Sequence, residues 1–385
     1  MRVGIVTYFD IANYGSVLQA YALKTVLEEY GVHSDFVRIH ERKAVNKYLH
    51  KIYVGAITAT KLLTSPTARK NHFEIRNLKK TTQSGISEET KNSFSSFVEN
   101  NLPSITLGRL ELVKLAHTSQ YDYFICGSDQ IWSPLSLHLS SYKFLEFAPE
   151  SKRIAYAPSF GVESIPEYNV RHIKKALRKM SYISVRETQG AVMIEELTGE
   201  KPPVMLDPTM LLTDEKWRRE YGKHQTKGYK KPYVLAYFFE EPSEEIIQEI
   251  MNCASADGLD VLVLMQTNEM LLRKGAVYVS ADPWEFLCLI DHAEYILTNS
   301  FHGAVFSVLF NKKFTVFNRR HSDNVKQTSR IATLLSTAGL SECIYREGEP
   351  IYKDRKPIEL EKIEKKRQES LQYISEALNL EIRNE

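Results

Sequence analysis

Short apolar runs alternate with segments of helical periodicity along most of the 385-residue chain. Each run has about the length of one strand, and several are followed by residues whose apolar positions recur every three or four places. The first run, Val3–Tyr8, precedes a Gly/Ser turn and an amphipathic segment that ends at Gly31. Repeated strand–helix units of this kind predict parallel sheets that are buried on both faces.

The pattern predicts two sets of strand–helix units. Strands of the first set are expected at 3–8, 33–39, 124–126, 154–157, 182–185 and 203–207, with a helix at about 188–198. Strands of the second set are expected at 233–239, 260–265, 276–279, 295–298 and 314–317, with helices at about 244–256, 283–292 and 303–309.

The length of the chain exceeds the size at which one hydrophobic core usually stops growing, so about two domains are expected. We predict an α/β fold of two Rossmann-like domains facing a cleft. The first domain covers 1–213, with a basic helical insert at about 41–100, and the second covers 232–358. The charged stretch 214–231 is expected to be the linker, and the tail 359–385 a helix that packs back across the hinge.

The composition is that of an ordinary folded protein, with 43% apolar and 25% charged residues. A net charge of +2 is too small to indicate a nucleic-acid partner. The four cysteines lie far apart, so neither disulfides nor a cysteine zinc site is expected. The N-terminus resembles a core strand more than a signal peptide, and no window reaches the roughly 18 apolar residues of a membrane span. A cytoplasmic location is therefore expected.

Polar clusters follow four predicted strands, at the edge where open α/β sheets bind ligands. They are Asn13-Tyr14-Gly15-Ser16, Gly127-Ser128-Asp129-Gln130, Ser159-Phe160-Gly161 and Asn299-Ser300-Phe301-His302-Gly303. A turn and a helix cap explain any one of them, but four in one chain favour a ligand site. The GxGxxG and GxxxxGK[ST] patterns are missing, which disfavours nicotinamide and P-loop chemistry. No HExxH, Cys/His cluster or DxD-like pair indicates a metal.

Two residues at predicted strand ends carry candidate chemistry. His302 lies at a helix start among hydrogen-bond donors and can exchange protons near neutral pH, although a cap or surface histidine is the plainer interpretation. Arg186 follows an apolar strand, so its guanidinium is expected near the strand end. The alternative to a functional role is a surface pair with Glu187. Arg319, Arg320 and Arg330 either add positive charge beside the last strand or form a solvated basic face.

Six segments, in order, resemble the polysaccharide pyruvyl transferase family: NYGSVLQAYAL, FICGSDQIW, YAPSFG, ISVRE, LDPT and TNSFHGAVFSVLFNKKF. The resemblance covers most of the chain from Gly4 to about Arg330. It implies a fold similar to GT-B glycosyltransferases, with the donor bound by the second domain. It further implies phosphoenolpyruvate as donor co-substrate, no other cofactor, and a pyruvate ketal formed on a sugar of a polysaccharide or lipid-linked glycan precursor.

In this family an arginine of a VRE-like motif and an arginine–leucine–histidine motif bind the donor, and the histidine is the acid/base. The matching positions here are Arg186 and Ser300-Phe301-His302, so a serine replaces the second arginine. Because phosphoenolpyruvate carries a phosphate and a carboxylate, its burial requires several charge-assisted hydrogen bonds. We hypothesise that Arg320, or else Arg330 or Lys313, supplies the missing charge. Ser300 and the amides of the helix start, near Phe301 and Gly303, would donate neutral hydrogen bonds.

The acceptor sugar is expected to meet the polar loops of the first domain, unless these are only caps and turns. The residues assigned to it are Asn13, Tyr14, Gly15, Ser16, Ser128, Asp129 and Gln130. Between Glu41 and Lys80 there are ten basic residues and two acids. This stretch, 41–80, either contacts a lipid-linked diphosphate or the anionic inner face of a membrane, at roughly 1 kcal/mol per basic residue, or is a solvated helical face.

Two other functions fit the same pattern. A GT-B-type glycosyltransferase would use a nucleotide-sugar and need a ribose-binding acid in the second domain, for which Asp282 and Glu285 are the candidates. A non-catalytic glycan- or anion-binding relative is favoured by the missing arginine.

Overall fold

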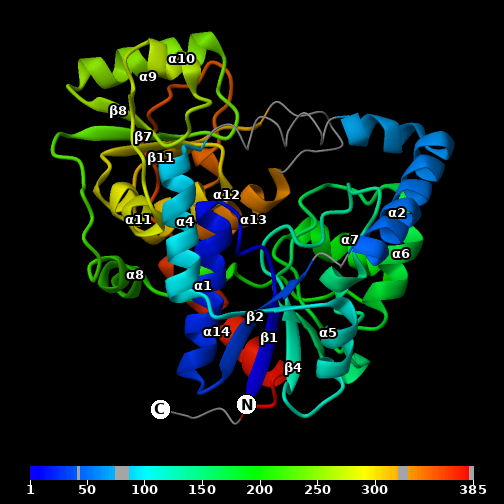
Figure 1. The fold of residues 1–385 in the computed structure, drawn as a ribbon. Coiled ribbons are helices and arrows are strands. Elements are labelled where there is room, and N and C mark those ends of the chain that lie inside the picture. The colour runs from blue at the N-terminus through cyan, green and yellow to red at the C-terminus, as the bar shows by residue number, and fades with distance from the viewer. Residues whose placement is uncertain (41–43, 74–85, 320–327, 381–385) are drawn as a thin grey trace.

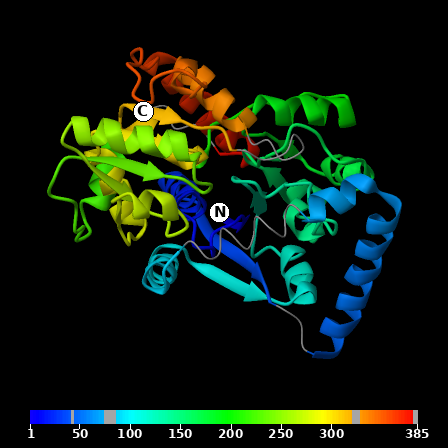
Figure 2. The same cartoon turned by 90° about the horizontal axis from the view of Figure 1, so that it is seen from above.

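The computed structural model describes residues 1–40, 44–73, 86–319 and 328–380. The chain forms two halves, each built on one parallel sheet, with helix α1 (Tyr14–Glu29) between them (Figure 1). The view from above shows the same division, with helix α2 (Ala44–Thr64) at the outer edge of the molecule (Figure 2).

The first sheet has six strands, and every neighbouring pair is parallel. Its spatial order is β3 (Ser104–Leu107), β2 (His33–Ile39), β1 (Arg2–Val6), β4 (Tyr123–Cys126), β5 (Arg153–Ala155) and β6 (Tyr182–Ile183). At its centre Ile5 is aligned with Phe36 on one side and Ile125 on the other. This is the strand order of a Rossmann sheet, in which the direction of winding reverses beside β1.

The second sheet has five parallel strands. Its spatial order is β11 (Phe314–Val316), β10 (Tyr295–Thr298), β7 (Tyr233–Tyr237), β8 (Asp260–Val263) and β9 (Val277–Tyr278). Every residue of β7, β10 and β11 is buried, as expected of parallel strands covered on both faces. The predicted α/β fold with two Rossmann-like sheets is confirmed.

Helices cover both sheets. Besides α1 and α2, the described helices are α4 (Glu88–Asn101), α5 (Arg109–Ala116), α6 (Glu167–Leu177), α7 (Thr188–Thr198), α8 (Asp214–Tyr221), α9 (Glu244–Ala256), α10 (Glu269–Arg273), α11 (Pro283–His292), α12 (Phe301–Leu309), α13 (Thr328–Ala338) and α14 (Leu360–Ala377). Residues 66–73 are also helical.

The two halves share a hydrophobic core along α1. The Tyr14 ring stacks on Phe286 of α11, with ring centroids 4.3 Å apart, and its hydroxyl donates to the Ala281 carbonyl at 2.9 Å. Helix α14 returns from the second half to the first, as predicted (Figure 1). There Tyr373 donates to the Ala155 carbonyl at 3.0 Å, and Ser370 accepts from the Leu206 amide at 3.0 Å.

The structure differs from two strand predictions. The expected strand at 203–207 forms only an isolated bridge between Val185 and Val204, because the prolines before it lack N–H donors and the chain turns at Pro208. Strand β3 was not predicted, since its four residues are partly exposed at the edge of the sheet. The predicted linker contains α8, whose Trp217 is buried, and the domain boundaries stay predictions. Parts of the basic insert, 41–43 and 74–85, lie outside the described residues.

Candidate active site

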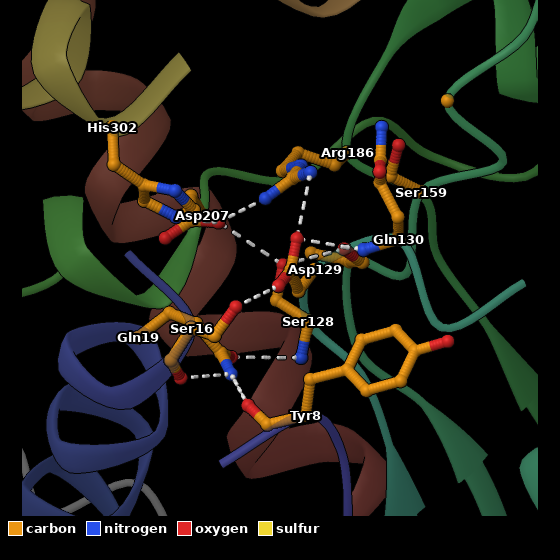
Figure 3. Close-up of polar contacts among 12 residues, drawn as sticks. Tyr8, Ser16, Gln19, Ser128, Asp129, Gln130, Ser159, Arg186, Asp207 and His302 are labelled. Carbon is orange, nitrogen blue, oxygen red and sulfur yellow. Dashed lines mark hydrogen bonds and ion pairs between the residues drawn. The ribbon is translucent and has the colours of Figure 1, made fainter. Parts of the chain in front are cut away.

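Side chains from both halves meet on the buried carboxylate of Asp207 (Figure 3). Arg186 Nη1 donates to Asp207 Oδ2 at 2.6 Å, and the side chains are 1% and 0% exposed. His302 Nε2, from the second half, lies 3.5 Å from the same oxygen. We call Asp129, Arg186, Asp207, His302 and Arg330 the central cluster.

The turn after residue 206 holds Asp207 in place. Its Oδ1 accepts hydrogen bonds from the amide and hydroxyl of Thr209 at 3.1 and 2.8 Å, while Pro208 begins the short helical turn. Burial opposes ionisation of this carboxyl, but the His302 imidazole and the Arg186 guanidinium outweigh burial and hold the pKa of Asp207 well below its ordinary value. Asp207 is therefore ionised at neutral pH.

Asp129 is a second carboxylate beside Arg186. Its Oδ2 accepts a hydrogen bond from the Ser16 hydroxyl at 2.6 Å, and its Oδ1 accepts one from the backbone amide of Gln130 at 2.8 Å (Figure 3). Arg186 Nη2 lies 3.7 Å from Oδ1. Burial alone would raise the pKa of Asp129, but Arg186 and His302 lower it overall. One guanidinium thus lies between two ionised carboxylates.

Two guanidiniums contact the ring of Phe301. Its ring centroid is 4.3 Å from Arg186 Cζ and 5.6 Å from Arg330 Cζ, distances typical of cation–π contacts. With its amide oxygen turned toward Arg330, Gln130 accepts from Nη1 at 3.2 Å and Nη2 at 2.8 Å. Burial and the neighbouring Arg186 lower the pKa of Arg330 to about 9. An anion beside this pair would therefore relieve their mutual repulsion.

Arg186 retains binding capacity, since its Nε and Nη2 atoms are buried without a hydrogen-bond partner among the described residues. The same holds for His302 Nε2. Buried donors of this kind are costly unless a ligand or water pairs with them.

The backbone of α1 forms one wall for the His302 ring. A Cβ atom at Gly15 would lie 1.8 Å from His302 Nδ1, so only glycine allows this close approach. Ser300 is the N-cap of α12, and its hydroxyl accepts from the Gly303 amide at 3.3 Å. The first turn of α1 thus limits the position of the imidazole, and the Ser300 cap fixes the start of the helix that carries it.

Three predicted site residues make contacts within the protein. Tyr14 is buried in the aromatic contact between the halves, which is a packing role, and its acceptor-binding assignment stays a prediction. Ser128 is fully buried, and its hydroxyl lies within hydrogen-bond distance of the Ala157 carbonyl at 2.8 Å and of Asp207 Oδ2 at 3.2 Å, so it contacts the central carboxylate from below. A Cβ atom at Gly303 would lie 2.5 Å from Thr298 Oγ1, and the Gly303 amide donates to the Ser300 cap, so both features support packing, while its donor-binding assignment stays a prediction.

The remaining predictions are placed as follows. Asn13 caps α1 by accepting from the Ser16 amide at 3.1 Å. Lys313 is exposed just before β11, and Arg320 lies outside the described residues. Of the suggested ribose-binding acids, Asp282 caps α11 and Glu285 accepts from the amides of Lys227 and Gly228.

The sequence did not single out Asp207 or Glu187. Glu187 is fully buried and its Oε1 accepts from the Ser159 hydroxyl and the Phe160 amide, both at 3.0 Å. The alternative of a surface pair with Arg186 is therefore wrong. The sequence does hold a signal for both residues, because each acid stands at the end of an apolar run. Glu187 is the acid of VRE, and Asp207 is the acid of LDPT.

Two hollows lie near strand ends. A cavity of about 30 Å³ is lined by Arg186, Asp207, Phe301, Arg330 and parts of α13 and α14. A larger one of about 530 Å³ lies beyond β7 and β10. We call it the glutamate pocket, because Arg319 and five glutamates line it: Glu240, Glu241, Glu245, Glu249 and Glu347.

Two kinds of feature were not found. Across the part of the chain that the structure describes, His, Cys, Asp and Glu side chains form no group of three that could hold a metal ion. No described helix combines the length and apolarity needed to cross a bilayer.

The chain is similar to known proteins in its fold and in its family. No curated protein matches the chain significantly. Solved structures of similar shape include UDP-GlcNAc 2-epimerase from Neisseria meningitidis bound to UDP-GlcNAc, at 10% identity and TM-score 0.44, covering 99% of this chain and 95% of that one. The S. aureus MnaA–UDP structure has 12% identity and TM-score 0.47, with 100% and 99% covered. Acinetobacter baumannii MurG has 9% identity and TM-score 0.44, with 98% and 99% covered.

The family comparison covers most of the sequence. The model described as polysaccharide pyruvyl transferase matches residues 13–321, a range that includes Arg186, Asp207 and His302. The resemblance inferred from the six segments is confirmed, and the chain belongs to the polysaccharide pyruvyl transferase family.

Proposed function

We propose that the central cluster is the active site of a pyruvyl transferase. It would use phosphoenolpyruvate to form a pyruvate ketal on a sugar of a polysaccharide or a lipid-linked glycan precursor. The observation that carries this proposal is the meeting of Arg186 and His302, from different halves, on the buried Asp207 carboxylate. Family membership supports the transferase class.

In the proposal, Arg186 and Arg330 bind the two anionic groups of the donor. Among the described residues, Arg186 Nε and Nη2 have no hydrogen-bond partner, and Arg330 also contacts the Phe301 ring. Arg330 would supply the charge that is missing at Ser300, whose hydroxyl caps α12. Each charge-assisted hydrogen bond contributes about 1.5–3 kcal/mol, so two guanidiniums offset much of the cost of burying the donor.

The cavity beside these residues, at about 30 Å³, holds only one or two water molecules. Phosphoenolpyruvate is larger, so the proposed donor enters when the two halves move apart. Because Arg186 and Asp207 come from the first half and His302 from the second, such a motion would open the site between them.

His302 is the proposed general acid. Transfer of its proton to the methylene carbon of the donor would create an oxocarbenium-like centre at the neighbouring carbon. One sugar hydroxyl attacks this centre and releases its proton, phosphate leaves, and a second hydroxyl closes the ketal with loss of its own proton. Asp207, 3.5 Å from His302 Nε2, would stabilise the protonated imidazole and orient the ring.

The acceptor sugar would lie on the side of the cluster formed by α1 and the loop after β4. There Asp129, Ser16 and Gln130 form one hydrogen-bonded group beside Gly15 and Asn13. Ionised Asp129 is the proposed acceptor for sugar hydroxyls, whereas the Tyr14 ring is packed between the halves and the Ser128 hydroxyl contacts Asp207.

The nucleotide-sugar alternative has less support. The larger hollow in the second half is lined by five glutamates, which repel a diphosphate. Asp282 and Glu285 are hydrogen-bonded to backbone amides of the protein. A cytoplasmic location is also proposed, supported by four cysteines that are all free thiols.

The proposed function is tested by incubating the protein with phosphoenolpyruvate and a panel of sugar acceptors. Phosphate release together with a product mass gain equal to a pyruvate ketal is the expected result. Calorimetry with phosphoenolpyruvate and with nucleotide-sugars separates the alternatives. Binding of a nucleotide-sugar without any binding of phosphoenolpyruvate would refute the proposal.

A further inference from the structure

Residues 51–73, which we call the arm, form an exposed helical projection from the first half. In both views α2 lies at the outer edge of the molecule, away from the two sheets (Figures 1 and 2). No residue from 51 to 64 is buried, although nine of these fourteen positions carry Ile, Tyr, Val, Ala, Leu or Gly. A helix of this composition is usually covered by another surface.

One side of the arm is fixed to the start of α6. Lys61 Nζ donates to Asn169 Oδ1 at 2.7 Å, and the Ser65 hydroxyl donates to Glu167 at 2.5 Å. Further along, the Asn71 amide donates to the Tyr168 hydroxyl at 3.2 Å. Since Ser65, Asn71 and Asn169 are buried, these contacts hold the arm in one orientation.

The opposite side of α2 presents an apolar stripe to solvent. Ile52, Ala56, Ala59 and Leu63 follow one another at intervals of four, three and four residues, which places them on one face of the helix. All four are exposed, with Ile52 at 54% and Leu63 at 80%. Tyr53 at 59% and Phe73 at 68% extend the apolar surface.

The charge of the arm has a single sign. It carries Lys51, Lys61, Arg69 and Lys70 and neither Asp nor Glu. Two other exposed leucines have acidic neighbours in the sequence. Leu110 is followed by Glu111, and Leu360 lies between Glu359 and Glu361. An apolar stripe on a segment whose Lys and Arg residues are not balanced by Asp or Glu is the pattern of a helix that lies in the interface of an anionic membrane.

We propose that the arm docks the protein onto an anionic lipid surface, with Ile52 and Leu63 entering the headgroup region and Lys51 and Lys70 contacting lipid phosphates. This inference does not depend on the proposed activity. An amphipathic surface helix binds reversibly, so the protein would sample the membrane without being anchored in it. A position at the surface would bring the site close to lipid-linked sugars.

Co-sedimentation of the full chain with vesicles tests the proposal. We expect binding to phosphatidylcholine vesicles that contain phosphatidylglycerol, and much weaker binding to phosphatidylcholine alone. Ile52→Asp with Leu63→Asp should lower the partition coefficient at least about tenfold, because apolar burial drives insertion. Lys51→Glu with Lys70→Glu should lower the partition coefficient by roughly 25-fold, because each basic residue near an anionic surface contributes roughly a factor of five.

Matched variants control for general effects on charge and surface. Leu110→Asp with Leu360→Asp changes two similarly exposed leucines, and Lys227→Glu with Lys230→Glu changes two exposed lysines before β7. Both controls should bind vesicles like the unmodified protein. Equal losses in control and arm variants, or no binding to anionic vesicles by the unmodified protein, would overturn the proposal. A dimer that dissociates only in Ile52→Asp with Leu63→Asp, without vesicle binding, would show that a second copy covers the stripe.

Discussion

The central cluster and the glutamate pocket both lie at the carboxyl ends of parallel strands, where this class of sheet binds ligands, but their linings differ. The central cluster combines Arg186, Arg330 and His302 with two carboxylates. The glutamate pocket has Arg319 among five glutamates and is the larger of the two. Topology therefore offers two places for a ligand, and the charge of the side chains decides which one suits an anionic donor.

The strongest test of this difference is the removal of the proposed acid. His302→Gln should lower the rate of pyruvyl transfer by about 10²–10⁴-fold, because general acid catalysis contributes about that much. The measurement is phosphate release under saturating phosphoenolpyruvate, with circular dichroism to show that the variant is folded. A folded variant with an unchanged rate would remove the central cluster from the chemistry.

Asp207→Asn tests whether the cluster also stabilises the fold. Loss of one partner from a buried ion pair costs about 3–5 kcal/mol, so the free energy of unfolding in urea at pH 7 should fall by about that amount. Because the folded-state pKa of Asp207 is depressed, its contribution is complete above the ordinary carboxyl pKa of about 4 and declines as the pH falls below it. The variant should therefore lose less stability than the unmodified protein between about pH 4 and pH 2. Identical pH profiles would contradict this interpretation.

A matched pair of arginine variants compares the two hollows directly. Arg330→Ala should weaken phosphoenolpyruvate binding by about 10–100-fold, since it removes charge-assisted hydrogen bonds worth about 1.5–3 kcal/mol. Arg319→Ala, in the glutamate pocket, should change it by less than about threefold. Calorimetric titration of both variants provides the measurement. The reverse order of effects would place the donor in the glutamate pocket.

Two glycines within helices provide the most modest test. Gly15→Ala should destabilise the protein by about 1–3 kcal/mol, because its methyl group would overlap the His302 ring. Gly55→Ala has open space around it and should instead stabilise α2 by about 0.5–1 kcal/mol. Thermal unfolding of both variants distinguishes them. Equal melting temperatures would mean that α1 and His302 are not in contact in solution.

Much of the fold follows from the order of residues, because parallel strands buried on both faces are continuous apolar runs. Strands β2 and β10 and helices α7, α9 and α11 lie where periodicity predicts them. Strand β3 carries too few apolar residues to stand out. At 203–207 the run of apolar residues is present, but the pairing fails, because prolines remove donors.

The candidate site was predicted in part. Arg186, His302 and Asp129 were identified because they follow strands, and strand ends converge at one edge of a sheet. The role of Asp207 depends on partners that are distant in sequence, at 186 and 302, so no local spacing reveals it. Likewise, Tyr14 and Ser16 are two residues apart in the sequence. Only the packing of α1 shows that Tyr14 faces the core and that Ser16 faces Asp129.

The ion pair between Arg186 and Asp207 has a consequence for selectivity. A tethered carboxylate is present at high effective concentration, so under the proposed function Asp207 would compete with an incoming anion for the charge of Arg186. A singly charged metabolite at Nε or Nη2 of Arg186 would have to share that guanidinium with Asp207 and would gain little from it. A molecule with two anionic groups would keep Arg186 satisfied and engage Arg330 as well, so the resting enzyme would filter its ligands by the number of charges they carry.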